Sequence, residues 1–307
     1  MKNNTSEIAQ IELVEVIDKL SSESSFKNVF HLSHAGLPIL SSQVLEQMVE
    51  LTRSILFPGY FGTFTASKAS VKYQMGVKVE ELSEGLTNQI LASLCFILEE
   101  GDKNIDEQEL KINAEEKSKA FITRLPKIRE VLLTDLQAMY NGDPAAKSYG
   151  EIIFCYPAIR AITNYRIAHE LLLLGVPLIP RIITEMAHSE TGIDIHPGAT
   201  IGEYFCIDHG TGVVIGETCI IGKHVQLYQG VTLGAKSFPL DENGNPIKGI
   251  PRHPIIEDNV IIYSNSTILG RITIGEGATI GGNLWVTNDV AKGERMIQAK
   301  SKNKEIM

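Results

Sequence analysis

Residues 256–286 read IEDNVI IYSNST ILGRIT IGEGAT IGGNLW V, and an aliphatic residue opens every block of six. The same spacing occurs earlier in the chain, in two shorter series. The aliphatic residues in these registers are Ile195, Ile201, Ile207, Ile215, Ile221, Leu227, Leu233, Ile256, Ile262, Ile268, Ile274, Ile280 and Val286. A helical period of 3.6 would spread them around a helix, and a strand period of two would not select every sixth residue. The pattern therefore predicts a parallel β-helix from about Ile193 to about Val290, in which three blocks complete one triangular coil.

Small residues often follow the aliphatic ones directly, where the chain must turn a corner of the coil. These residues are Gly202, Gly216, Gly222, Gly234, Gly275 and Gly281. Glycine tolerates tight turns and close backbone approach, so these positions fit the corners. We expect the aliphatic side chains to stack inward, with successive coils about 4.8 Å apart.

The six-residue spacing fails at two places. Eight residues separate Ile207 from Ile215, so two are extra, and they fall around Asp208-His209-Gly210. Twenty-three residues separate Leu233 from Ile256, which predicts a loop over residues 235–254. Long loops on a rigid scaffold are usually functional. Both interruptions are therefore candidate parts of a functional site.

The first half of the chain shows helical periodicity instead. We predict an α-helical domain over residues 1–190, a β-helix domain over 191–291 and a flexible tail over 292–307. The predicted helices cover residues 8–20, 42–57, 80–100, 114–140, 157–174 and 180–188. Residues 102–116 are polar and are expected to form an exposed connection. Pro126 is expected to kink or split the helix over 114–140.

Composition excludes several classes of protein. The net charge of −9 argues against a nucleic-acid partner. The four cysteines form no CxxC pair, which argues against a zinc ribbon or a redox dithiol, and free cysteines suit a reducing cytosol. No signal core and no apolar run long enough for a membrane span occur in the sequence. We therefore expect a cytoplasmic protein without a membrane partner.

Four motifs occur in order along the second half of the chain: Asp194-Ile-His-Pro, Asp208-His-Gly-Thr-Gly-Val-Val-Ile-Gly-Glu-Thr, Gln229-Gly-Val-Thr-Leu-Gly and Arg252-His-Pro. Asp143-Pro-Ala and Ala161-Ile-Thr-Asn-Tyr-Arg-Ile-Ala-His precede them. Together they resemble the serine O-acetyltransferases, of the hexapeptide acyltransferase family, in their variety with a longer N-terminal region. The resemblance covers about residues 143–282. It implies an α+β fold with an α-helical N-terminal domain followed by a left-handed parallel β-helix of hexapeptide repeats.

Acetyl transfer from a thioester to an alcohol requires a base, and histidine is the natural one near pH 7. A carboxylate on the other ring nitrogen fixes the tautomer and stabilises the imidazolium. The resemblance implies that His209 is the general base and that Asp194 is its partner. It also implies direct transfer without an acyl-enzyme.

A free amino acid offers a carboxylate and an ammonium group. Arginine holds a carboxylate with two parallel donors, and acidic side chains hold an ammonium. The resemblance assigns Arg252 and His253 to the serine carboxylate, and Asp143 and Asp208 to the serine ammonium.

Acetyl-CoA is the implied co-substrate, and neither a tightly bound cofactor nor a metal is expected. The resemblance places the pantetheine arm along small residues at the coil corners, namely Gly234, Ala235, Ser264 and Gly282. Lys236 or Lys248 is a candidate for the CoA phosphates, with a solvated loop lysine as the alternative.

Three alternative functions remain open from the residues. They are acetylation of another hydroxyl acceptor such as homoserine or a sugar, a γ-class carbonic anhydrase, and a non-catalytic scaffold of a cysteine-synthase complex. The histidine spacing does not fit the carbonic anhydrase metal site. The resemblance further implies a homo-oligomer, either a trimer or a dimer of trimers, and O-acetylserine sulfhydrylase as a partner. The C-terminus departs from the family pattern, because Met296-Ile-Gln-Ala-Lys stands where G-V-P-A is common.

Overall fold

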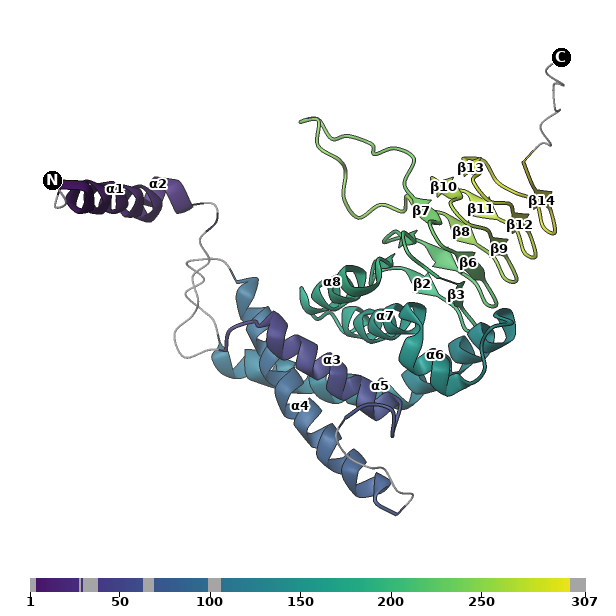
Figure 1. Ribbon diagram of the computed structural model, residues 1–307, viewed down its shortest axis with the longest axis horizontal. Coiled ribbons are helices and arrows are strands. Elements are labelled where there is room, and N and C mark those ends of the chain that lie inside the picture. Colours follow the sequence, from purple (N-terminus) through teal and green to yellow (C-terminus); the bar gives the residue numbers. More distant parts are fainter. Residues whose placement is uncertain (1–3, 28, 30–37, 63–68, 99–105, 299–307) are drawn as a thin grey trace.

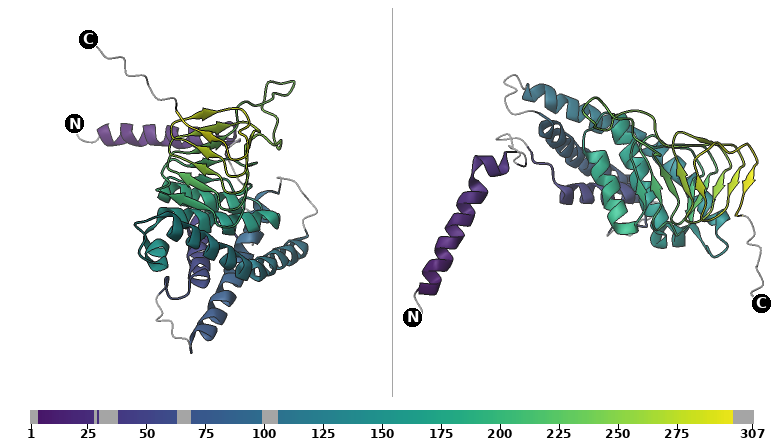
Figure 2. Two further views of the ribbon diagram at one scale, coloured as in Figure 1. Left: turned by 90° about the vertical axis from the view of Figure 1, so that its right-hand side faces the viewer. Right: turned by 90° about the horizontal axis from the view of Figure 1, so that it is seen from above.

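A computed structural model describes residues 4–27, 29, 38–62, 69–98 and 106–298 of the chain (Figure 1). Helices occupy the first part and short strands the second. The helices are α1 (Asn4–Ser21), α2 (Glu23–Phe26), α3 (Ser42–Leu56), α4 (Val71–Phe96), α5 (Glu107–Gly142), α6 (Tyr149–Cys155), α7 (Pro157–Leu173) and α8 (Ile179–Thr191). Helix α1 projects away from the rest of the molecule (Figures 1 and 2).

The strands form three parallel sheets that share one stack of coils, as the side view in Figure 2 makes clear. The first sheet holds β1 (Asp194–Ile195), β4 (Val214–Ile215), β7 (Thr232–Gly234), β10 (Thr267–Leu269) and β13 (Trp285–Val286). The second holds β2 (Thr200–Ile201), β5 (Ile220–Ile221), β8 (Ile255–Ile256) and β11 (Thr273–Ile274). The third holds β3 (Cys206–Asp208), β6 (Gln226–Tyr228), β9 (Ile261–Ile262), β12 (Thr279–Ile280) and β14 (Arg295–Met296).

The predicted parallel β-helix is confirmed. Along the first sheet, Ile195 pairs with Ile215, Ile215 with Leu233, and Leu233 with Ile268. All thirteen aliphatic residues at the six-residue spacing are buried, with at most 6% of their surface exposed. Each coil thus contributes one inward-facing residue per sheet, and these residues form the core by stacking coil on coil.

Backbone approach at the corners explains the small residues. A Cβ at Gly202 would lie 2.6 Å from the carbonyl oxygen of Gly222, and one at Gly222 would lie 2.8 Å from the nitrogen of Asp258. Real Cβ atoms do not approach so closely, so the six-residue spacing requires glycine there.

Several boundaries predicted for the helical region were wrong. Helix α5 begins at Glu107, so most of the connection expected over residues 102–116 is helical. The reason is local: Asp106 caps the helix, because its Oδ1 accepts from the N–H groups of Gln108 and Glu109 at 2.9 and 3.2 Å. Pro126 does not split α5, and the buried side chains of Leu125 and Ile128 hold that turn in the core; a kink at Pro126 stays a prediction. Helix α4 also starts earlier than expected, at Val71, and the short helices α2 and α6 were not predicted.

The β-helix continues beyond the boundary that we expected at residue 291. Strand β14 pairs with β12, with Thr279 opposite Arg295 and Ile280 opposite Met296. Gln298 Nε2 then donates to the carbonyl oxygen of Gly282 at 3.2 Å. The flexible tail predicted from residue 292 is therefore wrong for residues 292–298, because strand pairing holds them. Residues 299–307, including the chain end, lie outside the described part.

A buried ion pair fastens the helical region to the first coil. Arg166 on α7 donates from Nε and Nη2 to the Asp135 carboxylate on α5, both at 3.1 Å. It also donates to the carbonyl oxygens of Ile201 at 2.6 Å and Gly202 at 2.7 Å. Asp135 Oδ1 in turn accepts from the backbone N–H of Phe205 at 3.0 Å. These bonds fix the first coil against α5 and α7, and thereby position the later coils that stack on it.

No helix among the described residues is both long and apolar enough to cross a membrane.

Candidate active site

His209 lies in a bulge between the third sheet and the first. Asp208 still pairs with Tyr228 of the next coil, and the carbonyl oxygen of Thr211 accepts from the N–H of Gly230 at 2.9 Å. His209 and Gly210 are therefore the two extra residues, which confirms the predicted position of the insertion. Both adopt positive φ, 76° and 74°. The His209 side chain is exposed at this corner of the coil.

Asp143 lies close to this corner, at the C-terminal end of α5. Its Oδ1 accepts from the Ala145 N–H at 2.7 Å, and its Oδ2 accepts from the Tyr156 hydroxyl at 2.5 Å. The Tyr156 hydrogen bond is the main cause that lowers the pKa of Asp143, and the positive potential of His209 adds to it. The same bond raises the pKa of Tyr156 to about 12. We name Asp143, Tyr156, Asp208 and His209 the histidine corner.

Asp194 begins β1 on the neighbouring part of the first coil. The preceding residue, Ile193, packs against Gly210, where an added Cβ would lie 2.4 Å from the Ile193 Cδ1 atom. The described residues include no hydrogen bond between Asp194 and His209. Asp194 instead lies beside Glu185 and His188 of α8, with the three candidate ligand atoms within 4.8 Å of one another. The role of Asp194 as partner of His209 therefore stays a prediction.

The Arg252-His253 motif lies at a different corner, between the first sheet and the second. His253 is buried, and its Nδ1 accepts from the Thr218 N–H at 3.0 Å. In the neutral ring the proton is then on Nε2. Burial, with the nearby Arg252 charge, lowers the pKa of His253 to about 4, so the ring is neutral near pH 7. Gly216 leaves space for it, because a Cβ there would lie 2.1 Å from the imidazole.

Arg252 is held beside His253 by its own contacts. Its Nη2 pairs with Glu217 Oε2 at 2.7 Å, and its backbone N–H donates to Thr218 Oγ1 at 2.9 Å. The Nε atom is enclosed and has no partner among the described residues. We name Glu217, Thr218, Arg252 and His253 the arginine corner.

Within one chain the structure does not bring these two corners together. The histidine corner follows the third sheet, whereas the arginine corner follows the first, so the whole first sheet lies between them. The proposed CoA positions divide in the same way. Ser264 and Gly282 lie on the edge of the histidine corner, and a Cβ at Gly282 would lie 3.1 Å from the Ser264 carbonyl oxygen. Gly234 and Ala235 lie on the edge of the arginine corner, where the exposed loop with Lys236 and Lys248 begins.

Sequence reasoning missed three contributors to these corners. Tyr156 carried no motif, and only its 2.5 Å contact with Asp143 identifies it. Glu217 and Thr218 belong to the motif that begins at Asp208. Their role in holding Arg252 and His253 could not be predicted, because it depends on the 235–254 loop returning to the arginine corner.

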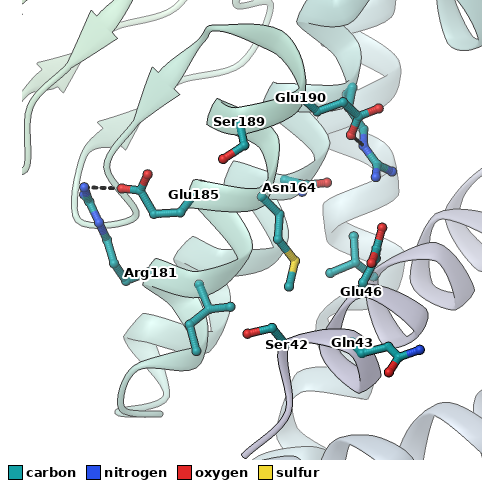
Figure 3. A pocket seen from close by; sticks show the side chains of 12 residues that line it. Ser42, Gln43, Glu46, Asn164, Arg181, Glu185, Ser189 and Glu190 are labelled. Carbon is teal, nitrogen blue, oxygen red and sulfur yellow. Dashed lines mark hydrogen bonds and ion pairs between the residues drawn. The ribbon is translucent and has the colours of Figure 1, made fainter. Parts of the chain in front are cut away.

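A separate hollow of about 780 Å³ lies between α3, α7 and α8, and Figure 3 shows it. Arg181 and Glu185 pair at its edge, joined by a dashed line in the figure. None of the residues predicted from the sequence to form the site lines this hollow.

The chain resembles known proteins over most of its length. A family model described as bacterial transferase hexapeptide (six repeats) matches residues 253–288. The plasmid serine acetyltransferase of Synechococcus elongatus is 48% identical over 290 residues, which cover 94% of this chain and 91% of the relative.

Solved structures agree with that relationship. Serine acetyltransferase 1 of Entamoeba histolytica, in complex with L-cysteine, is 34% identical with a TM-score of 0.71, over 93% of this chain and 95% of that one. A serine acetyltransferase in complex with CoA is 25% identical with a TM-score of 0.51, over 83% of this chain and 94% of that one. With its helical N-terminal region, its hexapeptide β-helix and this extent of identity, the chain belongs to the serine acetyltransferase family.

Proposed function

We propose that the histidine corner of one copy and the arginine corner of a second copy together form the active site. The chain is a serine O-acetyltransferase of cysteine biosynthesis. The observation that carries the proposal is the separation of the two predicted groups by the first sheet. One chain alone offers the base without the carboxylate-binding arginine.

His209 is the proposed general base. It removes the proton from the serine hydroxyl while the serine oxygen attacks the thioester carbon of acetyl-CoA. When the tetrahedral intermediate collapses, the C–S bond breaks and the His209 imidazolium returns the proton to the leaving thiolate. The products are O-acetylserine and CoA. Asp194 is the proposed carboxylate that orients His209, and its place on the adjoining β1 strand supports this role.

Asp143 and Asp208 are the proposed acceptors for the serine ammonium. The Tyr156 hydroxyl supports this role, because its hydrogen bond fixes the Asp143 carboxylate and lowers the pKa of Asp143. Arg252 and His253 are the proposed donors to the serine carboxylate. With Nη2 on Glu217 and Nη1 in only a 3.4 Å contact with the Ile250 carbonyl, Arg252 retains donor capacity for a ligand carboxylate.

Acetyl-CoA is the proposed co-substrate, and the relative solved with CoA supports it. The pantetheine arm would run between the edge with Ser264 and Gly282 of one copy and the edge with Gly234 and Ala235 of the other. Small residues at these positions allow close approach of the backbone.

A homo-oligomer follows from the shared site, and a trimer is the smallest closed assembly in which each copy lends one corner to each neighbour. Binding to O-acetylserine sulfhydrylase and location in the cytoplasm are further proposals. The four free cysteines support a reducing compartment.

Complementation between two impaired variants, assayed at a low serine concentration, tests the shared site. We expect His209→Ala to lower kcat by orders of magnitude and Arg252→Ala to raise the KM for serine strongly. When the two variants are unfolded together and refolded as a mixture, sites that take both intact corners should regain activity. Separately refolded and then mixed samples are the control. If the co-refolded mixture is no more active than the control, the shared site is wrong; if His209→Ala keeps wild-type kcat, the base is wrong.

A substrate panel separates serine from other acceptors. We expect CoA release with L-serine and far less with homoserine or galactosides. Equal rates with homoserine would contradict the proposed acceptor.

A further inference from the structure

The edge that carries His209 also carries one residue that the proposed mechanism has not used, Gln229. Beyond the third sheet, Leu227 of β6, Ile262 of β9 and Ile280 of β12 share one register. Two residues after each of them stand Gln229, Ser264 and Gly282. The backbone confirms that these residues adjoin, because Asn265 N–H donates to the Gln229 carbonyl and Asn283 N–H donates to the Ser264 carbonyl, both at 2.9 Å.

His209 lies at the beginning of this row. Asp208 pairs with Tyr228, and the Gly230 N–H donates to the Thr211 carbonyl, so the bulge with His209 lies directly opposite Tyr228 and Gln229. Successive coils are about 4.8 Å apart. The row therefore runs from the proposed base, through Gln229 one coil on, to Ser264 and Gly282 where the pantetheine arm is proposed to lie.

The Gln229 carboxamide has no hydrogen-bond partner among the described residues. Its Oε1 atom is enclosed and unpaired, whereas its Nε2 atom is unpaired without being enclosed. A neighbouring glutamine behaves differently: Gln226 Nε2 donates to the Tyr228 hydroxyl at 3.1 Å. Buried polar atoms normally have partners, so the unpaired carboxamide fits a group that binds something absent from the free chain. A half-turn of the carboxamide exchanges the enclosed oxygen with the nitrogen, so the side chain can present either an acceptor or an N–H donor there.

The course of the acetyl transfer indicates which group would bind to the Gln229 carboxamide. In direct transfer, the serine oxygen stays within hydrogen-bond reach of His209 while it bonds to the thioester carbon. The pantetheine arm extends from the same carbon toward Ser264 and Gly282. The reacting carbonyl must then lie between the two, at the level of Gln229.

We propose that Gln229 is a further catalytic residue, whose Nε2 donates a hydrogen bond to the thioester carbonyl oxygen as it becomes an oxyanion. The serine Oγ–C bond forms as the Oγ proton moves to His209, and the carbonyl electron pair moves onto the oxygen that Gln229 holds. Collapse re-forms the carbonyl, breaks the C–S bond and returns the proton from His209 to sulfur. This inference rests on the proposed role of His209.

The test compares Gln229→Ala and Gln229→Glu with a matched control, Gln226→Ala, in the assembled full-length protein. Removal of one oxyanion donor lowers turnover by about 100- to 1000-fold in enzymes that depend on it. We expect that loss in kcat for both Gln229 variants, with the KM for serine and the dissociation constant of CoA within about twofold of wild type. Gln229→Glu keeps the side-chain size, so it also serves if Gln229→Ala does not fold. Gln226→Ala should retain kcat within about threefold.

Three results would overturn the proposal: wild-type kcat in the Gln229 variants, a loss confined to the KM for acetyl-CoA, or an equal loss in Gln226→Ala. His209→Ala, measured in parallel, distinguishes the role of His209 from that of Gln229. An active His209→Ala protein would refute the base, whereas an inactive one beside a fully active Gln229→Ala protein would refute the role of Gln229 alone.

Discussion

Replacement of Arg166 by methionine tests whether the junction between the helical region and the first coil depends on its buried ion pair. The change removes four hydrogen bonds. The carbonyl oxygens of Ile201 and Gly202 lose their arginine donor, and the Asp135 carboxylate keeps only the backbone N–H of Phe205. Asp135 has 0% of its side chain exposed, and Arg166 only 9%, so water cannot replace the lost donors.

The expected loss in the free energy of unfolding is large. Removing one partner of a buried ion pair costs about 3–5 kcal/mol, and each orphaned carbonyl adds on the order of 1 kcal/mol. We therefore expect Arg166→Met to lower the free energy of unfolding by roughly 5 kcal/mol.

The pH dependence of that loss has a definite sign. Burial raises the pKa of Asp135, and Arg166 limits the rise. Without Arg166 the folded-state pKa rises further above the unfolded value of about 3.9. Between those two pKa values the folded chain binds more protons than the unfolded chain, so the variant loses stability as pH increases through that range. The difference from wild type should therefore be smallest near pH 4 and should grow toward pH 7.

Urea unfolding at fixed protein concentration measures the effect, with helical circular dichroism for the first domain and fluorescence of the single tryptophan, Trp285, for the β-helix. The matched control is Arg124→Met, which breaks the Arg124–Glu170 pair at 2.7 Å between α5 and α7. That pair is about one-third exposed, so its loss should cost at most about 1 kcal/mol. Equal unfolding midpoints for the two variants would refute the reasoning.

Two further predictions concern the corners. Tyr156→Phe should raise the KM for serine by roughly fivefold, corresponding to about 1 kcal/mol for one lost hydrogen bond, with kcat little changed. Its pH profile should lose serine affinity at a higher pH on acidification than wild type, because the pKa of Asp143 returns toward its usual value; coincident profiles would contradict this. His253 has a folded-state pKa of about 4, below the unfolded value of about 6.5, so the unfolded chain binds more protons between those values and stability falls as pH falls through them. His253→Gln should therefore lose less melting temperature than wild type between pH 7 and pH 5, and an equal loss in both proteins would exclude this role.

The amino-acid sequence determined the β-helix because its core is repetitive. One aliphatic residue per face, every six residues, is a local rule, and the thirteen residues that obey it are all buried. The insertion at His209 could be located for the same reason, since a regular count reveals two extra residues. The roles of the motif residues and the family came from the resemblance of the four motifs to serine O-acetyltransferases.

Helix boundaries were predicted less accurately from the sequence. They depend on capping residues and tertiary contacts, which hydrophobic periodicity does not reveal. Helix α5 includes residues 107–116 through the Asp106 cap, and it continues past Pro126 because the flanking side chains are buried. Strand β14 forms because it pairs with the exposed edge of β12, and the sequence of the tail alone does not predict this pairing.

Only the tertiary structure decided which predicted residues meet. The family resemblance assigns Asp143, Asp208, His209, Arg252 and His253 to one site, yet the fold places them at two edges of the coil with the first sheet between them. The physical reason is the threefold path of the chain: six residues further on always means another face, so nearness in sequence does not imply a shared edge. The same geometry aligns Gln229, Ser264 and Gly282, which are far apart in sequence, into one row beside the bulge that carries His209.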